Sequence, residues 1–499
     1  MSLLVVVVSL SACGGRGSSS SQAAASHIYS TFFTVGSTPF TAVIQIQGDG
    51  FENLAGYSFT VQPKAGSASA AVRVTYSMES LKTRGYAQNL GGGARPDVLT
   101  VPVYGLYSGY SNQVLLNLVY WDGTSQSVSL AISTPTYTDR TGLYATPIII
   151  KRRSPNAALG FSFFVIKSAL GSPVVVDTDG EIRWVGSGVS NSISTFVVSD
   201  GFIVGDAGAP IVHYLGLDGT VRQSPLQFPG VTSFHHNVDL GKQGYIAEVI
   251  TGPNVESIAS EITSEGRVLK TWDLGSILST YMQANGDDPS TFVRPGVDWF
   301  HMNAVAYDPS DDSLIVSSRE NFLIKLDYKT GDIKWIFGDP TKYWYTFPSL
   351  RAKAVILQGG GLYPIGQHAV SITSEGFLMV FNDGLGSGNQ PVGEPAGQSL
   401  TYSTVSAYSV DSNTLTARDV WDFDYGQSIY SRVCSSAYEA PSKSYLIDYA
   451  VADNMTAARL VGLDSSHNVV FDFQYPNASG CNTSWNAVPI PLDDMQVMQ

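Results

Sequence analysis

Short runs in which apolar and polar residues alternate occupy the first part of the chain after about residue 28. Between residues 40 and 134 they read FTAVIQIQ, YSFTVQP, AVRVTYSM, VLLNLVYW and SVSLAIST, separated by glycine-rich turns and by Asp122-Gly123. Alternation with a period of two places one face of each strand on a core. Strands at this spacing, with no helices between them, predict a small Ig-like β-sandwich over residues 28–140.

A different pattern begins after about Gly142 and recurs to the end of the chain. Each copy is a strand, a short polar turn that usually contains glycine, and a second strand with an aromatic residue. The copies are VVVDTDGEIRWVG, YLGLDGTVRQSPLQF, ITSEGRVLKTWDL, IKLDYKTGDIKWIFG, LTARDVWDFDYG and VGLDSSHNVVFDFQY. Units of roughly 50–60 residues suit propeller blades with insertions, whereas β-helix repeats are shorter and more regular. The chain is therefore predicted to be all-β, with a six-bladed β-propeller over residues 141–499.

Four of the seven histidines fall in three short strings on successive repeats. The strings are FHHN (Phe234–Asn237), WFHMN (Trp299–Asn303) and GQHA (Gly366–Ala369), and the nearby SSRE carries Arg319. Because a propeller gathers residues from every blade around one axis, we expect these side chains to converge. A guanidinium and several imidazoles suit the binding of a tetrahedral oxyanion such as sulfate or phosphate.

Composition narrows the choice of ligand. A length of 499 residues favours two domains, and only 14% of the residues are charged. The net charge of −14 argues against nucleic acid as a partner, because phosphate binding needs a basic face. An anionic substrate would have to be held by local cations rather than by the field of the whole protein.

The N-terminus predicts export. The apolar run Leu3–Leu10 is too short to span a bilayer, and it leads into Leu10-Ser11-Ala12-Cys13, which looks like a bacterial lipoprotein processing site. We expect residues 1–13 to be a signal peptide, Cys13 to be lipidated and residues 14–27 to be a flexible linker. An ordinary secretory signal cleaved nearby is the alternative. Both signals predict a periplasmic or cell-envelope protein. The lipoprotein signal also predicts that a lipid anchor is the only attachment to the membrane.

Two cysteines, Cys434 and Cys481, remain after the predicted signal peptide. They could pair in an oxidising compartment, but sequence does not show whether they lie close enough. No CxxC or HxxxH spacing supports a metal site, so we expect no metal and no cofactor.

Longer strings around the histidines resemble the bacterial arylsulfate sulfotransferase family, whose members do not use phosphoadenosine phosphosulfate. They are FHHNVDL, DWFHMNAVAYDPSDDSLIVSSRENFLIKLDYKTGDIKWIFGDP and GQHAVSITSEGFLMVFNDG, and VPVYGLYSGYSNQVLLNLVYWDG resembles the family's sandwich. The resemblance implies a six-bladed propeller with an added sandwich. It also implies aryl sulfates and phenols as the small-molecule partners, and a homodimer as a plausible assembly.

The resemblance also implies roles for individual residues. By motif, GQH makes His368 the nucleophile that becomes a sulfohistidine, and FHHN makes His236 a sulfuryl-binding residue with His235 as the less favoured neighbour. The other implied site residues are His301, Asn303, Arg319 and, in SRVCSSAY where the family carries a threonine, Cys434 or Ser435.

The chemistry fits these residue types, and several alternatives stay open. Sulfuryl transfer by analogy with phosphoryl transfer needs positioning and charge stabilisation, a neutral attacking imidazole and a protonated neighbour for the leaving oxygen. Water could replace the phenol, which would make the protein an aryl sulfatase. A lipid-anchored propeller that only binds or scaffolds is the third reading. Individually, His368 could simply satisfy a backbone carbonyl, and Arg319 could pair with a carboxylate.

Overall fold

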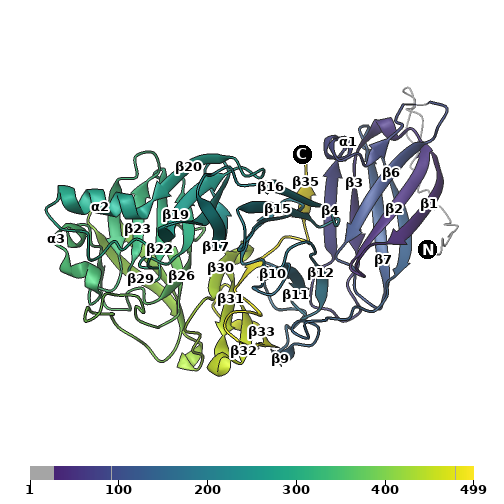
Figure 1. Ribbon diagram of the computed structural model, residues 1–499. Coiled ribbons are helices and arrows are strands. Elements are labelled where there is room, and N and C mark those ends of the chain that lie inside the picture. Colours follow the sequence, from purple (N-terminus) through teal and green to yellow (C-terminus); the bar gives the residue numbers. More distant parts are fainter. Residues whose placement is uncertain (1–26, 92, 478, 499) are drawn as a thin grey trace.

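Antiparallel sheets build both lobes of the protein, which we describe from a computed structural model covering residues 27–91, 93–477 and 479–498. The predicted signal peptide, the lipidation site Cys13 and the linker up to residue 26 lie outside these residues. Figure 1 shows the N-terminal strands in one lobe and the sheets that follow in a second, larger lobe. The all-β prediction is confirmed.

Two facing sheets form the N-terminal lobe, as the alternating pattern predicts. Alternate side chains of the strand 111–120 are buried, and core residues of both sheets join one apolar cluster. In spatial order, one sheet contains β1 (His27–Val35), β2 (Thr41–Asp49), β6 (Asp97–Tyr104) and β5 (Ala87–Gln88), and the other β35 (Met495–Val497), β4 (Val72–Ser77), β3 (Leu54–Val61), β7 (Ser111–Tyr120) and β8 (Ser125–Ser133).

Six further sheets form the propeller. Blade 1 contains β12 (Ile182–Val185), β11 (Val174–Asp177), β10 (Phe163–Lys167) and β34 (Asn486–Pro489); blade 2 β13 (Ser194–Val198), β14 (Gly201–Gly205), β15 (Ile211–Gly216) and β16 (Val221–Pro225); blade 3 β17 (Val231–Leu240), β18 (Tyr245–Thr251), β19 (Asn254–Ile262) and β20 (Val268–Asp273). Blade 4 contains β21 (Met302–Asp308), β22 (Ser313–Ser318), β23 (Leu323–Asp327) and β24 (Ile333–Phe337); blade 5 β26 (Gln367–Ile372), β27 (Leu378–Asn382), β28 (Thr404–Asp411), β29 (Thr416–Phe423) and β25 (Ile356–Gln358); blade 6 β30 (Ser436–Ala440), β31 (Ser444–Val451), β32 (Ala457–Leu463), β33 (Val469–Pro476) and β9 (Ile148–Lys151).

The innermost strands meet one another around the axis. Successive contacts join β13 to β17, β17 to β21, β21 to β26, β26 to β30 and β30 to β34. Five of the six repeated strings lie on hairpins of blades 1, 2, 3, 4 and 6, and the string in blade 5 covers β29 alone. The tight turns within them need glycine, as at Gly180 (φ 89°) and Gly219 (φ 92°), because a left-handed backbone disfavours residues with a Cβ.

Helices are few and short. They are α1 (Met78–Thr83), α2 (Leu274–Ala284), α3 (Pro348–Arg351) and α4 (Ala452–Met455), with 3-10 turns η1 (Phe51–Asn53), η2 (Tyr343–Thr346), η3 (Tyr425–Gln427) and η4 (Pro441–Lys443). None of the helices in the described part of the chain has the length and apolar character needed to cross a membrane.

The end of the described chain links the two lobes. β34 completes the sheet of blade 1 beside β10, and β35 then pairs in parallel with β4 of the sandwich (Figure 1). β9, which precedes blade 1 in sequence, is the outermost strand of blade 6. The strands β1 to β8 of the N-terminal lobe all precede residue 140, whereas β35 joins that lobe from the far end of the chain.

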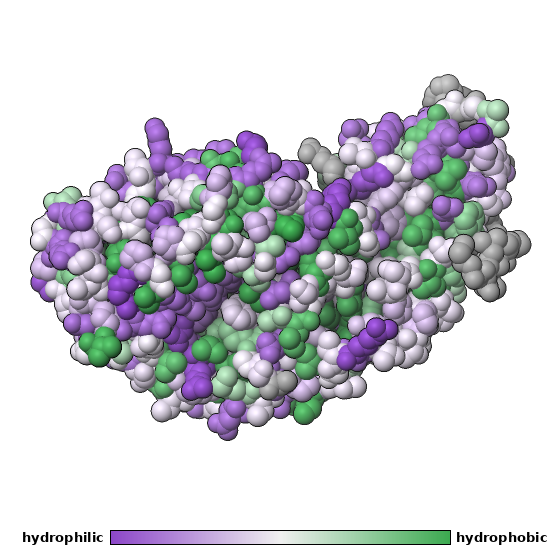
Figure 2. Space-filling view, viewed as in Figure 1, coloured by the Kyte–Doolittle hydropathy of each residue, from purple (hydrophilic) through white to green (hydrophobic). Residues whose placement is uncertain are grey.

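Polar contacts also join the lobes. The Arg183 side chain is buried; its Nε and Nη2 donate to the carbonyl oxygen of Gly105, and its Nη1 lies 3.1 Å from Asp177 Oδ2. On the face drawn in Figure 2, hydrophobic residues are mostly scattered among polar ones, as on an ordinary protein surface.

Cys434 and Cys481, whose pairing the sequence could not decide, form a disulfide. It joins Cys434, just before β30, to Cys481, between β33 and β34. The bond packs beside Ala450, Val451 and the partly buried ring of Trp485.

Candidate active site

Irregular pairing near the axis places the predicted histidines. The register of the innermost strand slips between Phe234 and Val238 in blade 3, between Met302 and Ala304 in blade 4 and between His368 and Ser371 in blade 5. His236 (φ 40°), His301 (φ 51°) and Ala369 (φ 50°) adopt a left-handed backbone at these points. Bulges of this kind redirect side chains that would otherwise follow the alternation of the strand.

Three of the four predicted histidines come together. The ring centroid of His236 lies 4.7 Å from that of His301 and 6.4 Å from that of His368. One ring nitrogen from each residue lies within 4.8 Å of those of the other two. The three nitrogens could therefore share one small ligand, either an oxyanion or a metal ion. The sequence-based expectation of no metal stays a prediction.

The bond to Nδ1 defines the chemistry of His368. Its Nδ1 lies 2.9 Å from the carbonyl oxygen of Gly366, which can only accept, so Nδ1 carries the proton and Nε2 keeps its lone pair. Burial, together with the positive charge of Arg319, lowers the pKa of His368 well below its usual value. The imidazole is therefore neutral, with an unprotonated Nε2, as a nucleophile requires.

His301 has the opposite surroundings. Its Nδ1 lies 2.5 Å from Asp298 Oδ2 and 3.0 Å from Glu256 Oε2. Burial alone would lower the pKa of His301, but the two carboxylates outweigh it and raise the pKa above its usual value. Burial raises the pKa of Glu256 itself to about 7, which the charge of His301 opposes. His301 is thus the imidazole most suited to carry a proton.

His236, rather than His235, faces the other imidazoles. The Nδ1 atoms of His235 and His236 lie 3.1 Å apart, and His235 Nδ1 lies 3.6 Å from Glu248 Oε2 on β18. His236 contacts the rings of His301, His368 and Trp485, whereas ring contacts of His235 within the described residues are limited to His236. Burial lowers the pKa of His235 to about 3, so it stays neutral.

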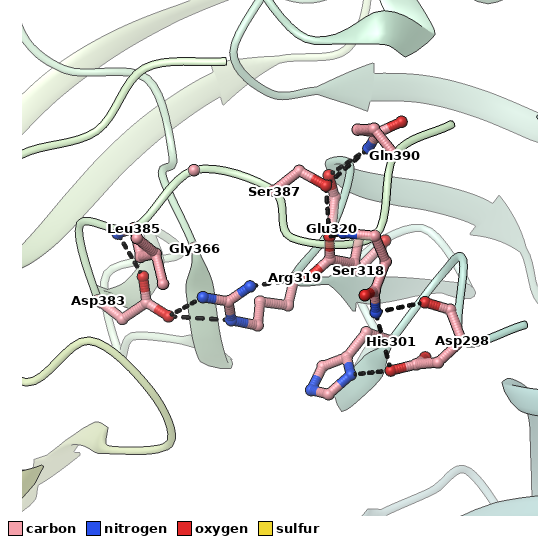
Figure 3. A network of polar contacts seen from close by, with 12 residues as sticks. Asp298, His301, Ser318, Arg319, Glu320, Gly366, Asp383, Leu385, Ser387 and Gln390 are labelled. Atoms are coloured by element: carbon pink, nitrogen blue, oxygen red, sulfur yellow. Dashed lines mark hydrogen bonds and ion pairs between the residues drawn. The ribbon is translucent and has the colours of Figure 1, made fainter. Parts of the chain in front are cut away.

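Two carboxylates hold the guanidinium of Arg319. Its Nε and Nη2 each lie 3.0 Å from Asp383 Oδ2, and its Nη1 donates to Glu320 Oε1 at 2.8 Å (Figure 3). Burial raises the pKa of Asp383 to about 7 although Arg319 opposes this shift. Asp383 Oδ2 also lies 3.8 Å from His368 Nδ1, so one carboxylate lies between the guanidinium and the predicted nucleophile.

Asn303 and Ser435 differ in what their polar atoms do. Asn303 Nδ2 donates to the carbonyl oxygen of Gln367, next to His368, at 2.8 Å, while Asn303 Oδ1 is buried without a partner among the described residues. Ser435 Oγ accepts from the Ala450 backbone N–H and contacts Ser431 Oγ at 2.8 Å. The structure therefore gives the Ser435 hydroxyl a role in fixing β31, whereas Asn303 has an acceptor to spare.

The sequence analysis did not identify the carboxylates of the site. Asp298 precedes His301 by three residues, Glu320 follows Arg319 directly and Asp383 lies in the string FNDG. Their closeness in sequence to predicted site residues was an available signal for the first two. Glu256 lies in the string PNVES, and nothing in that string distinguishes it from a solvent-exposed residue. In the structure it lies near the start of β19 with a left-handed backbone (φ 46°).

Residues 150–486 match the family model described as Arylsulfotransferase (ASST). The chain belongs to the arylsulfotransferase family. The matched region contains the three converging histidines, Arg319 and Asn303, so the predicted family membership is confirmed.

Individual relatives match a smaller part of the chain. The proteins named arylsulfate sulfotransferase AssT from Escherichia coli O6:H1 (strain CFT073) and from Lelliottia amnigena are 29% and 27% identical to it over 244 residues. These alignments cover 39% of this chain and 40% of each relative.

Among solved structures, the β-propeller domain of Cps50 (Swd1) from Myceliophthora thermophila aligns over 65% of this chain and 88% of its own length, at 12% identity and a TM-score of 0.35. BamB from Moraxella catarrhalis aligns over 74% and 96%, at 12% identity and a TM-score of 0.27. Both scores are low, and the architecture described above does not depend on them.

Proposed function

We propose that this arylsulfotransferase-family protein moves a sulfuryl group from an aryl sulfate to a phenol through a sulfohistidine at His368. The observation that carries the proposal is the hydrogen bond from His368 Nδ1 to the Gly366 carbonyl oxygen, which leaves the lone pair on Nε2. Family membership and the nearby cation Arg319 support the choice of an anionic substrate.

In the first half-reaction, Nε2 of His368 attacks the sulfur atom and the bond from sulfur to the aryl oxygen breaks. Electrons from that bond leave with the oxygen, which takes the proton of the His301 imidazolium and departs as a phenol. His368 now carries the sulfuryl group and His301 is neutral. The charge that spreads over the sulfuryl oxygens is stabilised by Arg319, whose orientation Asp383 and Glu320 fix in advance.

The second half-reaction reverses these steps with another phenol. Neutral His301 accepts the proton of the acceptor hydroxyl, the phenol oxygen attacks sulfur and the bond from sulfur to Nε2 breaks. Both residues return to their starting states, so protons balance over the cycle. His236 lies beside His368 and is proposed to orient the sulfuryl group, and the unpartnered Oδ1 of Asn303, whose Nδ2 binds the residue before His368, is proposed to accept from the incoming hydroxyl.

A chromogenic aryl sulfate with and without a phenol acceptor tests the proposal. We expect phenol release that an added acceptor accelerates, and one added sulfuryl group on the intact protein when donor alone is present. His368→Ala should abolish both signals. A variant that releases phenol as fast as wild type would rule out His368 as the nucleophile. Release that ignores the acceptor would indicate a sulfatase, and no release from a range of aryl sulfates would favour a binding module.

We also propose that the protein works in the bacterial cell envelope, held by a lipid on Cys13. The leader pattern at residues 3–13 supports export, and a Cys434–Cys481 disulfide is typical of oxidising compartments. Detergent-phase partitioning of the protein made in bacteria, with Cys13→Ser as the comparison, tests the anchor. A homodimer stays a prediction that sedimentation can check.

A further inference from the structure

The loop that joins β27 to β28, residues 383–403, leaves blade 5 and lies against blade 4. Ala396 forms an isolated antiparallel bridge with Lys342, and the Tyr343 backbone N–H donates to the Pro395 carbonyl oxygen at 3.0 Å. Within the loop, the Ser387 N–H donates to the Ala396 carbonyl oxygen at 2.8 Å, so its two legs pair. The β27–β28 loop is therefore held at both legs, which can give its side chains fixed positions.

One contact of this loop leads to Arg319. Ser387 Oγ and the backbone N–H of Asn389, the latter at 2.8 Å, both donate to Glu320 Oε2. The other oxygen of the same carboxylate, Oε1, accepts from Arg319 Nη1 at 2.8 Å (Figure 3). Glu320 thus joins the β27–β28 loop to the guanidinium of the site.

A second contact leads to His301. Asn389 Nδ2 donates to the Asp298 carbonyl oxygen at 2.8 Å and reaches Asp298 Oδ2 at 3.3 Å. That same Oδ2 accepts the 2.5 Å hydrogen bond from His301 Nδ1. Asp298 lies between α2 and β21 in residues 285–301, which contain no strand or helix, so no ladder of backbone hydrogen bonds orients it. The amide of Asn389 supplies that orientation from another blade.

From these contacts we infer that Asn389 and Ser387 are positioning residues for sulfuryl transfer: Asn389 orients His301 through Asp298, and Ser387 orients Arg319 through Glu320. The inference rests on the proposed function. It assigns the two carboxylates different duties, because one supports the proton donor and the other supports the group that stabilises charge on the sulfuryl oxygens.

Comparing two donors separates these duties. Phenyl sulfate has a poor leaving group that needs a proton, whereas 4-nitrophenyl sulfate releases a more acidic phenol that needs little help. Asn389→Ala should lower kcat/KM for phenyl sulfate roughly tenfold and for 4-nitrophenyl sulfate much less, as expected for one lost hydrogen bond to a charged group. Ser387→Ala should lower both values by a similar factor, because charge stabilisation serves either donor.

Val392→Ala provides a matched control. Val392 lies at the tip of the same loop with a fully exposed side chain (106%), so this variant should match wild type with both donors. Equal losses for both donors in Asn389→Ala would overturn the inference, since a loop that only supports the fold would not distinguish leaving groups. Wild-type rates in Asn389→Ala would overturn it as well.

NMR titration of the His301 ring gives a readout that needs no turnover. When Asn389 no longer orients Asp298, one of the two carboxylate contacts that oppose the effect of burial is weakened, so the pKa of His301 should fall in Asn389→Ala, while the pKa in Val392→Ala stays at the wild-type value. An unchanged or higher pKa in Asn389→Ala would contradict the inference. If wild type turns over no aryl sulfate but this pKa falls, the proposed function fails while the positioning contact stands.

Discussion

Three imidazoles in one small site acquire different properties because each Nδ1 has a different nearest partner. The carbonyl oxygen of Gly366 makes His368 a neutral ring with a free Nε2. The carboxylates of Asp298 and Glu256 favour a proton on His301. The Nδ1 of His236 faces another buried imidazole, that of His235. Residue types alone would not assign these roles, because they depend on which groups lie beside each Nδ1.

The pH dependence should follow His301. Asp298 and Glu256 raise its pKa, the positive charge of Arg319 lowers it, and the ring of His236 lies 4.7 Å away, centroid to centroid. Because the protonated ring is the acid, kcat/KM for phenyl sulfate should fall as pH rises through this raised pKa. His368 stays neutral throughout, so no loss of nucleophile is expected between about pH 5 and 7. In Asp298→Asn the falling limb should move to lower pH, measured by initial rates across pH; a limb at the wild-type position would exclude His301 as the acid.

Arg319→Lys should retain the positive charge and lose the planar guanidinium, whose N–H groups can donate to several acceptors at once. A lysine ammonium cannot donate at once to Asp383 and Glu320 with the same fixed geometry. We expect kcat to fall by about a hundredfold, as when one preorganised donor is removed from an oxyanion site. Steady-state kinetics with 4-nitrophenyl sulfate measure this, with circular dichroism to check the fold. A kcat within a few-fold of wild type would mean that a positive charge alone, without the guanidinium geometry, is sufficient to stabilise the sulfuryl oxygens.

Part of the site could be predicted from sequence, because four of the seven histidines fall in three short strings and Arg319 follows soon after the second of them. These strings predict His236, His301, His368 and Arg319 as site residues, and the structure brings the three imidazoles together. The carboxylates that tune them were not predicted, because aspartate and glutamate are common on turns and only the fold shows which are buried. The hydroxyl of Ser435 was assigned by motif position, and its backbone contacts depend on long-range packing that the motif does not encode.

At the scale of elements, the innermost strands of blades 3, 4 and 5 share one device. Each carries a bulge at or beside a histidine, so the regular antiparallel pairing with the next strand is interrupted where side chains turn toward the axis. The neighbouring segment before β30 is held by the Cys434–Cys481 disulfide instead. Trp485, whose ring centroid lies 5.2 Å from that of His236, packs beside that disulfide.

Replacing both cysteines by alanine should destabilise the propeller. Closing a loop of 47 residues contributes about 4 kcal/mol in the chain-entropy model. Chemical denaturation should show a lower midpoint, and a reductant should lower the midpoint of wild type but not that of the double variant. We also expect slower sulfuryl transfer, because Trp485 borders His236. An unchanged denaturation midpoint would show that the disulfide does not constrain the unfolded chain.

The repeated strings predicted the elements of the propeller because each outer hairpin is local in sequence. β9, β34 and β35 could not be assigned in this way, since their partners lie in distant parts of the chain. Each is three or four residues long, too short for an apolar pattern to identify its sheet. Their pairing emerges only when the ring of blades closes.

At the scale of the whole molecule, strands from both ends of the propeller sequence close the ring of blades. β34 joins blade 1 from the C-terminal side, β9 joins blade 6 from the N-terminal side, and β35 continues into the sandwich. Leu492, Met495 and Val497 are buried in the same apolar cluster as the sandwich core. The two lobes are therefore expected to unfold as coupled units rather than independently.

Deleting residues 493–499 tests this coupling. The change removes the buried side chains of Met495 and Val497 and the parallel pairing with β4, which should lower the free energy of unfolding of the sandwich by about 3–6 kcal/mol. The propeller retains β34, so the histidine site should form. Calorimetry should resolve an earlier transition than in wild type. An unaltered melting profile would mean that β35 contributes little to the sandwich.

The path of β35 limits how these lobes can be recombined in evolution or by engineering. A cut between β8 and β9 looks like a convenient border, yet it would separate β4 from a strand encoded more than 350 residues later. A sandwich moved on its own would lack β35, and the remaining propeller would carry β35 as an apolar segment without its partner strand β4. The pair should therefore be inherited and exchanged as a single cassette.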